Sequence, residues 1–304
     1  MSNEKIKSVL AFDLDGTLTP RNKFDIHPKG LSELLNYLDK LSHLVIPVTG
    51  KPVSYAENIF STNALEDRGI IAENAGVYRK PGSKKVEVYG PSLDEIKKLR
   101  DLIGIGMDKV NVTKIKLFEK EYEVSIDAGD VSILTVFTDP SFVTHRWSFK
   151  HEIQANECVE KLNIIIENNS WGKNLEVLAP FPDGGVQVIR KDPKTGKSVD
   201  KSSIIRNLHT MYPDLGNVPI AMFGDGHNDI PAMKPKEIIP LTFSNAHDEV
   251  IAFVKNKGGF VSEYEAPERN GVVDGIKWLA NRNFFGKDKG IILETAKRYS
   301  INRL

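Results

Sequence analysis

Residues 8–17 read Ser8-Val9-Leu10-Ala11-Phe12-Asp13-Leu14-Asp15-Gly16-Thr17. The first five residues have the length and apolar character of a buried β-strand, and the polar, glycine-containing segment after them ends it. This order predicts a loop rich in carboxylates at the carboxyl end of the strand. An Asp-x-Asp pair also occurs in calcium loops, turns and helix caps. The rest of the chain must therefore decide what the two aspartates do.

The chain on either side of this stretch alternates between apolar runs and helical patterns. Beyond Pro28, leucines recur at the spacing of an amphipathic helix. Such alternation predicts an α/β fold whose parallel strands are joined by right-handed crossovers. The other elements expected in this sheet are strands over residues 44–48, 69–72, 218–223 and 237–243 and a helix over residues 204–211.

The middle of the chain has a different pattern. Residues 85–89 and 186–190 alternate between apolar and polar side chains, which is typical of half-exposed strands. Helical stretches near 93–103 and 152–167 accompany them, so the middle is expected to form an α+β unit. The predicted organisation is one domain made of residues 1–77 and 201–304, interrupted by a second domain of residues 78–200.

The composition excludes several classes of protein. The 304 residues carry 41 Lys and Arg against 41 Asp and Glu, so no net charge favours nucleic acid or anionic membranes as partners. A single cysteine, Cys158, excludes an intramolecular disulfide framework and is expected to be a small buried hydrophobe. No apolar run is long enough to cross a bilayer. We therefore expect a cytoplasmic protein without a signal peptide.

Polar residues follow three of the expected strands. Asp13 and Asp15 follow the first strand, Thr49 follows the second, and the segment 224–229 (Gly224-Asp225-Gly226-His227-Asn228-Asp229) follows a later one. Ligands of open parallel sheets bind at the carboxyl ends of the strands. Carboxylates gathered there need a cation, and oxygen donors favour Mg²⁺ over zinc. Since Mg²⁺ leaves positions to substrate phosphate, a phosphate ester is the expected substrate class.

These residues carry a resemblance to a known family. Residues 13–17, Thr49, Lys201 and residues 224–229 resemble, in order and placement, the four motifs of the haloacid dehalogenase superfamily. Residues 72–76 (Ala72-Glu73-Asn74-Ala75-Gly76) and the inserted unit are similar to its Cof-type branch, subfamily IIB. The resemblance implies a Rossmann-like core with a C2-type cap that restricts the substrate.

The resemblance also implies roles for the aspartates. Asp13 would be the nucleophile that forms an aspartyl-phosphate, and Asp15 would be the general acid and base. Mg²⁺ would be bound by Asp13, the backbone carbonyl of Asp15 and the Asp225 carboxylate, with Asp229 supporting the site. Superfamily members that break carbon–halogen bonds lack the second aspartate, so its presence favours phosphate-ester hydrolysis.

The remaining implied residues bind phosphate. Thr49 with the amide of Gly50 would hold the phosphoryl oxygens, Asn228 would add a polar contact, and Lys201 would neutralise the developing charge. Lys201 is chosen because it opens a helix-like run, with Lys191 as the alternative. His227 receives no role.

The sequence thus predicts a Mg²⁺-dependent phosphatase of a small phosphorylated metabolite, with a sugar phosphate favoured. A phosphomutase or phosphotransferase of the same fold remains an alternative, as does a phosphometabolite sensor without activity. A monomer and a homodimer both stay open.

Overall fold

The chain divides into two compact units in the computed structural model. The structure describes residues 5–20, 23–88, 94–103, 112–117, 120–126, 133–137, 149–178, 185–192 and 195–299. One unit comprises Met1–Glu87 with Asp200–Leu304, and the other comprises Val88–Val199.

The first unit is built on a parallel sheet, as the alternating pattern predicts. Its strand order is β13-β12-β11-β1-β2, and every neighbouring pair is parallel. Phe12 at the end of β1 is in register with Phe223 and with Pro47, so these strands end at the same edge. The strands are β1 (Ser8–Phe12), β2 (His43–Pro47), β11 (Ile220–Phe223), β12 (Ile238–Thr242) and β13 (Phe260–Val261).

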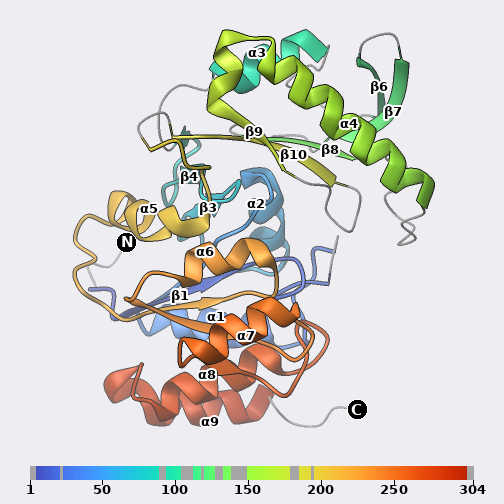
Figure 1. Ribbon diagram of the computed structural model, residues 1–304. Helices are drawn as coiled ribbons and strands as arrows, with labels where there is room; N and C mark the ends of the chain where they lie inside the picture. The colour runs from blue at the N-terminus through green and yellow to red at the C-terminus, as the bar shows by residue number, and fades with distance from the viewer. Residues whose placement is uncertain are drawn as a thin grey trace. The chain divides into compact units, whose positions relative to one another are not determined.

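Helices cover both faces of this sheet. Figure 1 shows α1, α8 and α9 on one side of β1, and α5 and α6 on the other. The leucine spacing after Pro28 does form a helix, whose leucines are buried. The helices of the unit are α1 (Leu31–Lys40), α2 (Val53–Thr62), α5 (Ile204–Met211), α6 (Ile230–Met233), α7 (Asp248–Asn256), α8 (Gly271–Asn281) and α9 (Lys289–Tyr299), with a short 3₁₀ turn at Gly286–Asp288.

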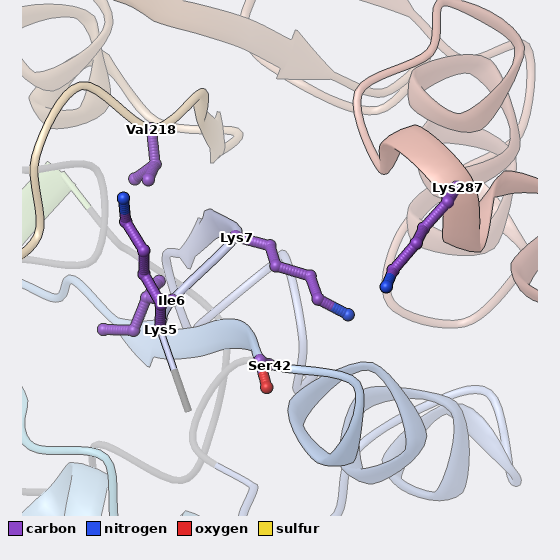
Figure 2. A pocket seen from close by; sticks show the side chains of 6 residues that line it. All are labelled: Lys5, Ile6, Lys7, Ser42, Val218 and Lys287. Carbon is purple, nitrogen blue, oxygen red and sulfur yellow. The ribbon is translucent and has the colours of Figure 1, made fainter. Parts of the chain in front are cut away.

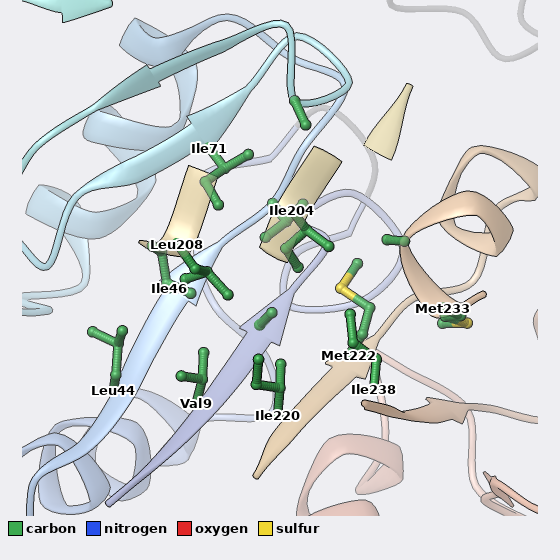
Figure 3. Packing of buried hydrophobic residues seen from close by; sticks show 14 of the residues in the cluster. Val9, Leu44, Ile46, Ile71, Ile204, Leu208, Ile220, Met222, Met233 and Ile238 are labelled. Atoms are coloured by element: carbon green, nitrogen blue, oxygen red, sulfur yellow. The ribbon is translucent and has the colours of Figure 1, made fainter. Parts of the chain in front are cut away.

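A continuous apolar core joins strands and helices on one face. Leu44, Val9 and Ile220 come from three neighbouring strands, and Ile204 and Leu208 of α5 pack against them (Figure 3). Burial of such side chains contributes roughly 1.5–3 kcal/mol each. The strand ends that carry the polar segments are therefore anchored in the apolar core of the unit.

A small sheet extends the first unit beyond the expected boundary. It consists of β3 (Ile70–Ala72), β4 (Val77–Arg79) and β5 (Val86–Val88). Ile71 bridges to Val48 on one side and pairs with Tyr78 on the other. The sequence-based boundary at Tyr78 falls inside this hairpin, so the unit keeps its compactness as far as Glu87.

The second unit, as far as the structure describes it, is an antiparallel sheet with a ten-residue helix and a nineteen-residue helix. Leu99 of α3 and Leu162 of α4 pack in one cluster with Val188 of β10, and Cys158 is buried there as expected. Among the helices that the structure describes, none is long and apolar enough to span a membrane. The strand order is β6 (Val112–Leu117), β7 (Lys120–Ile126), β8 (Ile133–Phe137), β10 (Gly185–Arg190), β9 (Leu175–Val177), and the helices are α3 (Asp94–Ile103) and α4 (Phe149–Glu167), followed by a 3₁₀ turn at Ser170–Asn174.

Candidate active site

The parallel register brings the polar segments to one edge of the sheet. The Asp13 amide donates to the carbonyl of Phe223 at 2.9 Å, and the Val48 amide donates to the carbonyl of Phe12 at 2.7 Å. These hydrogen bonds continue the ladder past the last strand residues. The three polar segments therefore start at the same edge of the sheet, at Asp13, at Thr49 and in the loop after Phe223.

Lys201 contacts two of the four predicted carboxylates. It begins the 3₁₀ turn Lys201–Ser203 before α5, which Asp200 caps by accepting a 2.9 Å hydrogen bond from the Ser202 amide. Its Nζ donates to Asp13 Oδ1 at 2.7 Å and to Asp229 Oδ1 at 2.6 Å. The Lys201 side chain has no solvent exposure. The alternative lysine, Lys191, belongs to the second unit.

Three buried carboxylates face one another. Asp13, Asp225 and Asp229 each offer an oxygen, and these oxygens lie within 4.8 Å of one another. Asp225 accepts from Thr17 Oγ1 at 3.4 Å, and a Cβ on Gly16 would lie only 2.3 Å from Asp225 Oδ2. Gly16, which has a φ of +83°, therefore lets the first loop approach the third without a clash.

The charges of this cluster do not balance. Burial and the charge of Asp229 raise the pKa of Asp13 to about 6, against the opposing effect of Lys201. Burial disfavours the charge of Lys201, but Asp13 and Asp229 outweigh it and raise its pKa. Within the part of the chain that the structure describes, this cluster sets three buried carboxylates against the Lys201 ammonium, which is a surplus of negative charge. The donor set therefore suits a hard divalent cation such as Mg²⁺.

Thr49, Gly50 and Asn228 meet at a second point of the same edge. Thr49 is buried and its Oγ1 accepts from the Lys51 amide at 3.1 Å. A Cβ on Gly50 would lie 3.0 Å from Asn74 Oδ1 and 3.4 Å from Asn228 Nδ2. The predicted residues thus lie around Gly50, whose backbone amide has no side chain of its own beside it. Such an amide can donate to a phosphoryl oxygen.

Asn74 is a member of this group that the residue-by-residue prediction did not include. Its side-chain Oδ1 accepts from Asn228 Nδ2 at 3.4 Å, and its backbone amide donates to the Thr49 carbonyl at 3.1 Å. Glu73, Asn74 and Ala75 all have a positive φ, of 50°, 53° and 64°. Three consecutive non-glycine residues in this region are costly and often mark functional sites. The sequence does carry two signals for Asn74: polar residues end the third apolar run, and residues 72–76 carry part of the family resemblance.

Asp15 lies apart from the three clustered carboxylates. Its Oδ1 accepts a 2.7 Å hydrogen bond from the Tyr55 hydroxyl, and Lys51 Nζ lies 3.8 Å from its Oδ2. Asp15 remains partly accessible, with 19% of its side chain exposed. No sequence pattern pointed to Tyr55, because its contact depends on how α2 packs beside the first loop.

His227 is consistent with having no assigned role. Its side chain is 54% exposed, its Nε2 lies 3.6 Å from Glu249, and its ring contacts that of His247.

A different hollow lies at the opposite end of the strands. Lys5, Lys7 and Ser42 line it before the starts of β1 and β2, together with Val218 and Lys287, and Figure 2 shows their side chains around it. Lys7 is paired there with Asp288 at 2.7 Å. None of the predicted catalytic residues lines this hollow.

Comparison with protein families gives one match. The model for haloacid dehalogenase-like hydrolases matches residues 10–180. None of the curated proteins compared with the chain matches it.

Several solved structures share the fold. The C-terminal domain of C. albicans trehalose-6-phosphate phosphatase has a TM-score of 0.56 at 16% identity, covering 97% of this chain and 93% of its own. A subclass IIB sugar phosphatase of the same superfamily has a TM-score of 0.52 at 16% identity, covering 91% and 99%. A Thermotoga maritima protein has a TM-score of 0.57 at 17% identity, covering 87% and 94%. At these identities the likeness concerns the fold.

Proposed function

The chain belongs to the haloacid dehalogenase-like hydrolases, and from this premise we propose that it is a Mg²⁺-dependent phosphatase of small phosphorylated metabolites. The observation that carries the proposal is the buried contact of Lys201 with both Asp13 and Asp229 at 2.7 and 2.6 Å. It holds Oδ1 of Asp13 and so orients the carboxylate for attack. A sugar phosphate is the favoured substrate, because two of the structural relatives are named as a trehalose-6-phosphate phosphatase and a sugar phosphatase.

Asp13 acts as the nucleophile in this proposal. Its free oxygen attacks phosphorus, and the bond to the leaving alcohol breaks as an aspartyl-phosphate forms. Asp15 gives the alcohol its proton and then takes a proton from the water that hydrolyses the intermediate. Lys201 stabilises the charge on Asp13 and on the phosphoryl group.

Thr49, the Gly50 amide and Asn228 bind the phosphoryl oxygens. The close approach of Asn74 and Asn228 to Gly50 supports this role, because it brings the Asn228 amide next to the Gly50 backbone. Asn74 holds Asn228 through their 3.4 Å contact. Fixed donors of this kind need no reorganisation when charge develops.

The cation is held by Asp13, Asp225 and the backbone carbonyl of Asp15, with Asp229 in support. When bound, Mg²⁺ neutralises charge on the nucleophile and on the phosphoryl oxygens. The surplus of buried carboxylates supports this assignment. The inserted unit Val88–Val199 is proposed to be the cap that selects the substrate.

The test is phosphate release from a panel of sugar, polyol and cofactor phosphates. The expected result is release that needs Mg²⁺, stops with EDTA, and is lost in Asp13→Asn. Asp214→Asn, which removes an exposed carboxylate from the turn after α5, is the matched control and keeps full activity. Unimpaired release by Asp13→Asn would remove Asp13 as the nucleophile. If acceptor sugars are added and phosphorylated sugars form in place of free phosphate, the result favours a phosphotransferase.

A further inference from the structure

Asp15 is oriented by two residues outside the predicted motifs. The Tyr55 hydroxyl donates to Asp15 Oδ1 at 2.7 Å, and Lys51 Nζ lies 3.8 Å from Oδ2. Asp13, only two residues earlier, points instead to Lys201. The two aspartates thus have separate sets of neighbours, one buried in the sheet edge and one on the side of α2.

Tyr55 is itself held in place. It lies in the first turn of α2, where its amide donates to the Pro52 carbonyl at 3.1 Å. Its ring packs against Phe24 with 5.3 Å between the ring centroids, and the Lys51 ammonium lies 5.5 Å from the ring centroid. Contacts with an aromatic ring and a cation restrict the phenol. The hydroxyl therefore meets Asp15 at a position determined by the fold.

We propose that Tyr55 is a positioning residue for proton transfer by Asp15, an inference that rests on the proposed phosphatase function. The phenol donates to Oδ1 and Lys51 lies beside Oδ2, so these two neighbours fix the direction of the carboxyl group. Without the phenol, the carboxyl group loses this restraint on its rotation about the Cβ–Cγ bond. The rate of proton transfer depends strongly on such orientation.

The proton and bond changes balance within the two steps. In the first, the bond between Asp13 and phosphorus forms, the bond from phosphorus to the alcohol oxygen breaks, and the proton on the Asp15 carboxyl group moves to that oxygen. In the second, the water oxygen binds phosphorus, the bond to Asp13 breaks, and a water proton returns to the Asp15 carboxylate. Tyr55 keeps its own proton throughout.

This role predicts a dependence on the leaving group. Benzyl phosphate releases an alkoxide that needs a proton, whereas p-nitrophenyl phosphate releases a nitrophenolate that leaves without one. The two compounds are similar in size, so contacts that depend on shape affect both. Removing a residue that acts through Asp15 should therefore slow the hydrolysis of benzyl phosphate and leave that of p-nitrophenyl phosphate unchanged.

The experiment compares kcat/KM of Tyr55→Phe with the unmodified protein on both compounds. This constant reports the steps up to the first irreversible cleavage, before Asp15 acts as a base. General acid catalysis is worth roughly 10²–10⁴-fold, and we expect the variant to lose about tenfold on benzyl phosphate and less than about twofold on p-nitrophenyl phosphate. Tyr37→Phe, on α1 of the same unit, is the matched control and changes neither value.

An equal loss on both compounds, or no loss on either, overturns the proposal. A double-mutant cycle gives a second test: in an Asp15→Asn background, Tyr55→Phe should cause no further loss on benzyl phosphate. A further loss as large as in the unmodified protein would show that Tyr55 does not act through Asp15. Failure of the phosphatase function is recognised separately, by release that does not depend on Asp13.

Discussion

Lys201 and Asp229 form an ion pair that has no contact with solvent. Lys201 Nζ lies 2.6 Å from Asp229 Oδ1, and neither side chain has any exposed surface. The other oxygen of Asp229 accepts from the Gly226 amide at 3.0 Å. Asp229 is thereby fixed by its own loop and fixes the ammonium that reaches Asp13. We propose that Asp229 supports the site through this lysine.

Replacing Lys201 should destabilise the first unit. Lys201→Met leaves Asp13 and Asp229 buried without their cation, and breaking a buried pair in this way costs about 3 kcal/mol or more. Denaturant unfolding at pH 7 measures the free energy of unfolding. The double variant Lys201→Met with Asp229→Asn should recover part of the loss, because it removes one uncompensated charge.

Lys255→Met is the matched control, since Lys255 is exposed on α7. Its free energy of unfolding should stay within about 0.5 kcal/mol of the unmodified protein. A Lys201→Met variant as stable as this control would contradict the buried pair.

Magnesium should stabilise the protein through Asp225. A ligand that binds only the folded state raises the free energy of unfolding by about 2.7 kcal/mol when its concentration is one hundred times its dissociation constant. Thermal unfolding with Mg²⁺ and with EDTA should therefore differ in the unmodified protein and in Asp214→Asn. Asp225→Asn, which removes one of the three clustered carboxylates, should lose most of that difference, and a full shift in this variant would exclude Asp225 as a ligand.

Gly16 should be required for the approach of two loops. Gly16→Ala strains a residue with φ +83° and places a Cβ 2.3 Å from Asp225 Oδ2. Gly216→Ala strains a residue with φ +65° that has no atom within 4 Å of the new Cβ. In both variants the backbone strain should lower the free energy of unfolding by about 1 kcal/mol. Only Gly16→Ala should also lose phosphate release and Mg²⁺ stabilisation, and identical behaviour of the two variants would contradict this account.

His43 should make the protein less stable in acid. Burial lowers the pKa of His43 from 6.5 to about 4, although Asp288, 3.4 Å away, opposes the shift. Between these values the unfolded chain binds more protons, so the stabilisation is complete above pH 6.5 and is lost as the pH falls toward 4. A pKa difference of this size corresponds to about 3 kcal/mol.

The measurement is the free energy of unfolding at several pH values between 4.5 and 6.5. His43→Asn should give a shallower dependence than the unmodified protein, because no histidine then titrates at this position. His209→Asn, which replaces an exposed histidine of α5, should leave the slope unchanged. Equal slopes for His43→Asn and the unmodified protein would show that His43 does not contribute to it.

Local patterns in the sequence are enough to predict strands β1, β2, β3, β11 and β12 and helices α1 and α5. Apolar runs mark β1, β2 and β11, and polar residues mark where each one ends. Because parallel strands in register finish at one edge, the order of these runs alone predicts that Asp13 and Asp225 meet. The periodicity after Pro28 likewise predicts α1, whose spacing depends only on neighbours along the chain.

The partners of the side chains are decided only by the tertiary structure. Tyr55 meets Asp15, and Asn74 meets Asn228, across elements whose packing no local pattern describes. The end of the first unit at Glu87 depends on the pairing of Ile71 with Tyr78. Hydrophobic periodicity determines which faces are buried, but distances of about 3 Å between residues far apart in the chain depend on how those faces pack together.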